Sequence, residues 1–290
     1  MSTLLPVTHL FDFEHTHDKT RPYIMAEFAA NGGTNLVLTD TLIREVMRRP
    51  DFAKTLHKDI DSAGVKFVDA HAPFGQIEDL NLPFEDLRPS MLMRLKLVLE
   101  IIADFGVNSI TCHVGNTPEA FADYSLDHLQ TCIIRSLEEL LPVAERLGIT
   151  LAIENIWFPT STPEKLLGII RHFNSDSLGL CYDAGHANLM AKDRGAKDSN
   201  PIQAWQRFGD IPYDTTILEK MLPYLTTCHL HDNNGIWDEH LLPGRGNIDW
   251  PRLISLLKTA PRLKCFQNEV SPIRTGASIT DICKTFRKLI

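Results

Sequence analysis

The sequence predicts an α/β protein built as a single (β/α)8 TIM barrel. Two observations predict this class: short apolar runs alternate eight times with longer segments of helical periodicity, and no linker or low-complexity stretch interrupts the 290 residues. An open, doubly wound sheet is the alternative, but it predicts a glycine-rich phosphate-binding turn after the first strand, and none occurs there. We therefore expect residues 1–290 to form one domain.

The elements follow one another as strand and then helix along the whole chain. The expected strands are Val7–Phe11, Thr34–Leu38, Val65–Asp69, Ser109–His113, Thr150–Glu154, Leu178–Asp183, Thr226–His231 and Lys264–Val270. The expected helices are Arg21–Asn31, Thr41–Ala63, Pro89–Phe105, Asp123–Leu147, Pro163–Phe173, Ile202–Phe208, Pro251–Thr259 and Ser278–Leu289. Gly64, Gly106 and Gly148 mark three helix ends, and Pro163 and Pro251 stand near helix starts. Each strand is thus expected to be followed by one helix.

Composition places the chain among ordinary globular proteins and excludes several functions. It is 43% hydrophobic and 23% charged, with a formal net charge of -8 and no polybasic run, which argues against a dedicated nucleic-acid binder. The N-terminus has neither a basic start nor a long apolar segment, so we expect a cytoplasmic protein that does not enter membranes. The six cysteines form no CxxC pair, which predicts buried, reduced thiols.

Imidazole and carboxylate groups recur at the carboxyl ends of the last six expected strands. In a TIM barrel these ends meet at one rim, where catalytic groups lie. The groups are His71, His113, Glu154, Asp183, His186, His229, His231, Asp232, Asp238, His240 and Glu269. Independent structural histidines have no reason to gather at one rim, and clustered carboxylates need a cation to offset their repulsion. This pattern therefore predicts a divalent-metal site, and zinc, manganese, cobalt or iron suit such ligands.

Two further segments near the expected rim differ in whether they are expected to contribute to the site. The first, HLFDFEHTHD, is rich in acids and histidines, and we expect it to be a solvated loop rather than part of the metal site. The second contains Trp157, which follows the strand that ends at Glu154 and could stack on a substrate ring.

The order of these groups resembles the xylose isomerase-like TIM barrel superfamily, which contains sugar and sugar-phosphate isomerases and epimerases and the endonuclease IV type of AP endonuclease. The resemblance covers Val65 to the C-terminus. Its motifs are His71, His113, EN (Glu154 and Asn155), DxxH (Asp183 to His186), HxxD (His229 to Asp232), DxH (Asp238 to His240), GxGxxD (Gly244 to Asp249) and Glu269.

Resemblance to the ketose 3-epimerases implies one divalent metal, such as manganese, zinc, cobalt or magnesium. The implied ligands are Glu154, Asp183, His229 and Glu269. The two glutamates would also act as catalytic residues that move protons on either face of a sugar or sugar phosphate, through a metal-stabilised enediolate. The expected substrate-binding residues are His71, His113, His186 and Trp157, with Arg245 placed to hold a phosphate or carboxylate or to pair with a neighbouring acid.

Resemblance to the endonuclease IV branch implies a trinuclear zinc site instead. His71, His113, His186, Asp238 and His240 would then be additional ligands, and all nine positions have the required residue type. The loop after His71, GQIEDLNLPFED, is acidic, however, which disfavours a DNA substrate. A small sugar is therefore the expected partner. Other chemistry of the superfamily, such as cyclitol dehydration, and a catalytically idle sugar binder stay open, and a homodimer is the expected assembly.

Overall fold

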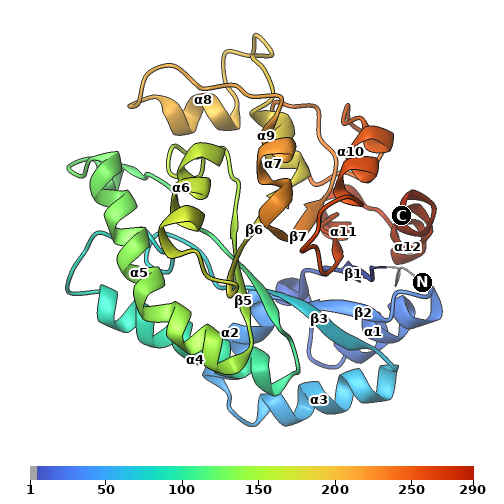
Figure 1. Ribbon diagram of the computed structural model, residues 1–290. Helices are drawn as coiled ribbons and strands as arrows, with labels where there is room; N and C mark the ends of the chain where they lie inside the picture. The colour runs from blue at the N-terminus through green and yellow to red at the C-terminus, as the bar shows by residue number, and fades with distance from the viewer. Residues whose placement is uncertain (1–4) are drawn as a thin grey trace.

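Eight parallel strands close into one barrel in the computed structural model, which describes residues 5–290. The strands follow sequence order around the barrel (Figure 1). The last strand, β8, pairs with β1, with Thr8 opposite Gln267. They are β1 Val7–His9, β2 Asn35–Leu38, β3 Lys66–His71, β4 Ser109–Cys112, β5 Thr150–Glu154, β6 Leu178–Asp183, β7 Leu225–Leu230 and β8 Phe266–Asn268. The predicted TIM barrel is confirmed.

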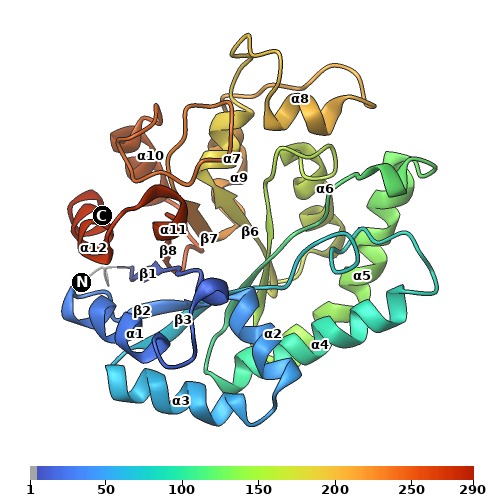
Figure 2. The same ribbon diagram turned by 180° about the vertical axis from the view of Figure 1, so that it is seen from behind.

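The helices pack around the outside of this barrel, as Figures 1 and 2 show from opposite sides. The α-helices are α1 Arg21–Ala30, α2 Asp40–Arg48, α3 Phe52–Ala63, α4 Arg88–Asp104, α5 Leu126–Leu147, α6 Pro163–Phe173, α7 Ala184–Leu189, α8 Asn200–Trp205, α9 Ile217–Met221, α10 Trp250–Leu257, α11 Pro272–Thr275 and α12 Ile279–Leu289. Short 3-10 helices are η1 Phe13–His15, η2 Glu119–Phe121 and η3 Leu222–Tyr224. In both views α8 projects from the barrel together with the loops beside it.

Two of the helix predictions were wrong, for local reasons. The predicted helix Thr41–Ala63 is two helices, because Pro50 lacks the N–H that a continuous helix needs and α2 ends at Arg48. The expectation of one helix per strand also fails after β6, which is followed by α7, α8 and α9, and after β8, which is followed by α11 and α12. Helix ends at Gly64 and Gly148 are as expected, and both glycines adopt the left-handed conformation with φ 68°.

Strand β6 shows how the fold brings a carboxylate to the rim. Leu178–Asp183 is a fully buried strand, and Asp183 is also the N-cap of α7, where its side chain accepts a hydrogen bond from the backbone N–H of His186. The strand thus ends in a residue that must turn the chain into a helix. This turn puts Asp183 at the rim of the barrel, with His186 in the first turn of the helix that follows.

Two further expectations bear on the environment of the protein. All six cysteines are buried and free of disulfides, as the scattered spacing predicted. Over the described residues 5–290, the helices are all too short or too polar to cross a lipid bilayer.

Candidate metal and substrate site

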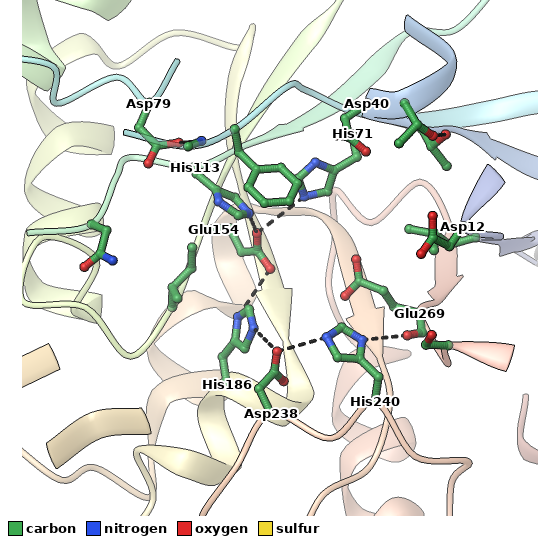
Figure 3. A pocket seen from close by; sticks show the side chains of 18 of the residues that line it. Asp12, Asp40, His71, Asp79, His113, Glu154, His186, Asp238, His240 and Glu269 are labelled. Atoms are coloured by element: carbon green, nitrogen blue, oxygen red, sulfur yellow. Dashed lines mark hydrogen bonds and ion pairs between the residues drawn. The ribbon is translucent and has the colours of Figure 1, made fainter. Parts of the chain in front are cut away.

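The carboxyl ends of the strands open into a cavity of about 510 Å³, and small-molecule sites typically measure ~300–1,000 Å³. Figure 3 shows imidazole and carboxylate side chains pointing into this space from several strands. The acidic and imidazole side chains that line it are Asp12, Glu14, Asp40, His71, Asp79, His113, Glu154, His186, Asp238, His240 and Glu269. Because charged groups are costly to bury, they must pair with one another or with a ligand.

Three carboxylates converge on one ring nitrogen at the floor of the cavity, Nδ1 of His229. The nearest oxygen of Glu154 lies 3.0 Å from that nitrogen. The nearest oxygens of Glu269 and Asp183 lie 3.3 Å and 3.7 Å from it. The other ring nitrogen of His229 lies 3.2 Å from the Thr111 hydroxyl, which turns Nδ1 toward the acids. This donor set suits a divalent cation.

A pair of histidines faces the second oxygen of Glu154. Glu154 Oε2 lies 3.1 Å from His113 Nε2 and 3.9 Å from His71 Nε2. The Nδ1 of His71 is 2.9 Å from the backbone carbonyl of Ala72, which leaves Nε2 free to face the carboxylate. One ligand atom from each of His71, His113 and Glu154 lies within 4.8 Å of the others, so these three residues could also hold a metal ion.

Asp238 links two more histidines on the opposite wall (Figure 3). Its Oδ2 lies 2.9 Å from His240 Nε2 and 3.7 Å from His186 Nε2. The second nitrogen of each ring is engaged by a backbone carbonyl, that of Glu269 for His240 at 2.8 Å and that of Asn155 for His186 at 3.0 Å. Both imidazoles are therefore oriented with Nε2 toward Asp238.

The electrostatics of the carboxylates are set by the surrounding imidazoles. Burial alone would raise the pKa of Glu154, but His229 and His113 outweigh it and hold that pKa well below its usual range. Burial likewise opposes ionisation of Glu269, yet His229 and then His240 lower its pKa. Both glutamates are thus held as carboxylates, the form that binds a cation or accepts a proton.

The histidines divide into two kinds. Burial would lower the pKa of His186, but the carboxylates of Asp183 and Asp238 outweigh it and raise that pKa to about 10. For His71, burial and then the charge of His113 outweigh the nearby Glu154 carboxylate and lower its pKa. A neutral His71 is free to act as a ligand or as a hydrogen-bond partner.

The donor atoms of this site fit a metal ion because two of them lack partners. Within the described residues, Glu154 Oε2 and Asp238 Oδ1 are buried without a hydrogen bond. Glu154 Oε2 is near His113 Nε2, but the two atoms are not aligned for a hydrogen bond. A buried carboxylate oxygen without a donor is costly, and a bound cation would remove that cost.

The structure gathers nearly all of the predicted site residues. Those that line the cavity or form its floor are His71, His113, Glu154, Trp157, Asp183, His186, His229, Asp238, His240 and Glu269. Trp157 presents its ring edge-on to His186, with centroids 4.8 Å apart. Arg245 is exposed in the loop before α10 and is not among the lining residues. The ligand and substrate roles of all these residues stay predictions.

Sequence reasoning missed an acidic wall at the mouth of the cavity. Asp12 and Glu14, from the segment expected to be a solvated loop, line the cavity together with Asp40 and the buried Asp79. Asp12 is held there by accepting a hydrogen bond from the N–H of Glu14. No sequence motif marks these acids, because their approach depends on how the loops after β1, β2 and β3 fold.

Phe74 was also missed, whereas His231 was recognised among the imidazoles at the strand ends but was given no role. Phe74 is 45% exposed and lies against the rings of His113 and His71, with centroids 4.6 Å and 5.3 Å away, so it forms an apolar wall. His231 is fully buried behind Asp183. Its place directly after β7, in the motif HLHD, was a signal that the sequence did contain.

Comparison with known sequences identifies a family and several relatives. Residues 27–263 match the family described as the xylose isomerase-like TIM barrel. The uncharacterized protein MJ1311 of Methanocaldococcus jannaschii is 30% identical over 226 residues, which cover 73% of this chain and 70% of that protein.

Comparison with solved structures adds two similar barrels. A D-tagatose 3-epimerase-like protein has a TM-score of 0.73 at 22% identity, and the match covers 97% of this chain and 95% of that one. The IOLI protein, solved with a bound zinc atom, has a TM-score of 0.66 at 17% identity, covering 97% of this chain and 95% of that one. At these identities the likeness establishes the shared fold.

Proposed function

The chain belongs to the family of xylose isomerase-like TIM barrels, and on this premise we propose that it is a divalent-metal-dependent sugar isomerase or epimerase. The observation that carries the proposal is the convergence of three carboxylates on His229 Nδ1, at 3.0, 3.3 and 3.7 Å. Manganese, zinc, cobalt and magnesium are all candidates for the metal, and its proposed ligands are Glu154, Asp183, His229 and Glu269.

The two glutamates are the proposed proton-transfer groups. Glu154 ends β5 and Glu269 follows β8, and these strands lie three positions apart in the ring of eight, so the carboxylates reach the cavity from different sides. Both line the cavity, and their lowered pKa values keep them ionised, the form in which a carboxylate can accept a proton. One carboxylate takes the proton from the carbon beside the substrate carbonyl, and the other, once protonated from solvent, returns a proton to it as the conjugate acid.

A bound divalent cation would supply Lewis-acid stabilisation of the negative charge that develops on the substrate oxygens. The remaining work belongs to side chains of this chain. His71, His113 and His186 offer ring nitrogens to substrate hydroxyls, and Trp157 and Phe74 offer apolar faces to the carbon side of a sugar.

The charges around the cavity favour an unphosphorylated sugar. Asp12, Glu14, Asp40 and Asp79 add negative charge beyond the proposed ligands, and Arg274 is the one arginine or lysine among the described lining residues. A phosphate group would meet repulsion across most of this mouth, whereas hydroxyl groups can donate hydrogen bonds to the carboxylates.

A trinuclear phosphoesterase, such as an AP endonuclease, is the second candidate. The observation in its favour is that the Nε2 atoms of His186 and His240 both face Asp238, whose Oδ1 is left without a partner. The acidic mouth argues against a polyanionic nucleic acid, whose binding relies on basic side chains.

Element-resolved metal analysis of untagged protein, purified without chelator, separates these candidates. The isomerase proposal expects about one manganese, cobalt, magnesium or zinc ion per chain, together with solvent deuterium entering the carbon beside the carbonyl of at least one ketose in a panel. Three zinc ions per chain, with phosphodiester cleavage and no deuterium exchange, would overturn it in favour of the phosphoesterase.

A further inference from the structure

His231 occupies a position between the two halves of the site that the proposed ligand sets do not use. Its ring is fully buried, and its Nε2 lies 3.1 Å from Asp183 Oδ2 and 3.7 Å from Asp238 Oδ1. The same ring stacks on His240, with centroids 4.0 Å apart and planes at 12°. The His231 side chain thus contacts Asp183 on one side and both Asp238 and His240 on the other.

The surroundings hold this ring in a single place. Gly185, in the first turn of α7, provides the space for it, since a methyl group at that position would collide with the His231 ring. The next residue, Asp232, is anchored by accepting hydrogen bonds from the backbone N–H of Gly244 at 2.8 Å and from Trp250 Nε1 at 2.9 Å. The backbone on either side of His231 is therefore fixed by β7 and by this anchored aspartate.

The hydrogen bond to Asp183 is the contact with a chemical consequence. Asp183 Oδ1 accepts the backbone N–H of His186 at 2.6 Å, and its Oδ2 faces His231 Nε2. With hydrogen on Nε2, His231 donates to Oδ2, the oxygen that also lies 3.7 Å from His229 Nδ1. The two donors together fix the plane of a proposed ligand relative to the ring nitrogen beside it.

We propose that His231 is a positioning residue that orients the Asp183 carboxylate for metal binding through its Nε2–H. This inference rests on the proposed function, because it assumes that Asp183 is a ligand. Hydrogen-bonded partners of ligating side chains commonly change metal affinity 10–100-fold when they are removed. Loss of the His231 hydrogen bond is predicted to change metal affinity by a factor in that range. The stacking on His240 keeps the His231 ring in the plane that the hydrogen bond requires.

The experiment measures zinc affinity by competition with a chromophoric chelator in two substitutions at one position. His231→Phe keeps a flat ring over His240 but has no donor for Asp183. His231→Gln gives up the ring but can place an amide N–H near the position of Nε2. We expect His231→Phe to weaken zinc binding about 10–100-fold and His231→Gln to retain nearly the wild-type affinity.

A third variant, Gly185→Ala, displaces the ring without altering it and should weaken zinc binding as His231→Phe does. Melting temperatures of the metal-free variants report whether the fold is intact, independently of the affinity. Wild-type affinity in His231→Phe, or equal weakening in both His231 variants, would overturn the positioning role. A lower zinc stoichiometry in His231→Gln would overturn it differently, by making His231 a ligand itself.

Failure of the proposed function has a separate signature in the same experiment. Wild-type protein that binds no zinc, manganese, cobalt or magnesium would refute the metal-dependent enzyme and this inference together. If the wild-type protein binds metal and the His231 variants bind it with the same affinity, only the inference about His231 is refuted.

Discussion

Two neighbouring layers of the barrel interior bury carboxylates in opposite ways. In the deeper layer, the two oxygens of Asp69 accept hydrogen bonds from the N–H of Ala70 at 3.0 Å, Ser109 Oγ at 2.7 Å, Thr227 Oγ1 at 2.6 Å and Cys265 Sγ at 3.4 Å. Each oxygen thus has two donors, all of them neutral. The carboxylate is fully satisfied by the fold and has nothing left to offer a ligand.

The layer above it, two residues further along the strands, is left incomplete. His71 follows Asp69 on β3, and His229 follows Thr227 on β7, so alternation puts them on the same inner face. Here the carboxylates face imidazoles, and Glu154 Oε2 lacks a hydrogen bond. Burial of an acid therefore does not by itself indicate a functional site. A buried carboxylate oxygen that lacks a hydrogen bond and is surrounded by ring nitrogens does indicate one.

The largest effect expected from this comparison is on turnover. Glu154→Gln, and equally Glu269→Gln, should lower the rate of solvent exchange into the substrate about 10²–10⁴-fold, because an amide cannot accept the proton. Asp69→Asn is the matched control one layer deeper, and it should retain the wild-type rate. Full activity in both glutamine variants would show that the incomplete layer does not perform proton transfer.

A smaller effect is expected on the free energy of unfolding, and it should follow from a substitution in the deeper layer. Asp69→Asn replaces an acceptor oxygen with a donor that faces Thr227 or Ser109, so it should lower the free energy of unfolding by about 1–3 kcal/mol. Urea unfolding of the metal-free protein measures this loss. Metal affinity of the same variant should be unchanged, and a variant that lost its metal would show that the two layers are not independent.

The sequence was sufficient for the barrel and for most of the site because both depend on local patterns. Strand ends are visible as apolar runs that stop at an acid or histidine, and barrel closure then brings those ends together, as for Glu154 and Glu269. The break between α2 and α3 was also visible in principle, at Pro50, but helical periodicity on both sides concealed it.

What the sequence could not supply were positions that depend on loop conformation. Arg245 lies near the site residues in sequence, yet its segment wraps around the Asp232 carboxylate, which accepts the N–H groups of Gly244 at 2.8 Å and Ile248 at 3.3 Å. Asp12 shows the converse, because a polar segment without a motif folds over the cavity mouth. Periodicity encodes neither outcome, because the first depends on hydrogen bonds to a distant aspartate and the second on the conformation of a polar loop.

His9 on β1 extends the comparison from acids to histidines. Its ring is 4% exposed and packs near Phe28 and Phe286, with centroids 5.4 Å and 6.2 Å away, and its Nδ1 has no hydrogen-bond partner within the described residues. Burial lowers the pKa of His9 to about 4, whereas the carboxylates around His186 raise the pKa of that residue to about 10. One histidine is thus buried as a neutral ring and the other beside charges.

The smallest predicted effect follows from this neutral burial. Because burial holds the folded pKa of His9 below its usual value of 6.5, the unfolded chain binds the proton first as the pH falls. The stabilisation is complete above about pH 6.5 and is lost toward pH 4, which amounts to about 2 kcal/mol between pH 7 and pH 5. Urea unfolding of metal-free wild type and His9→Leu at both pH values isolates this contribution, because every other titrating group is common to the two proteins. His9→Leu should lose about 2 kcal/mol less than wild type over this interval, and equal losses would mean that His9 accepts a proton in the folded state as readily as in the unfolded chain.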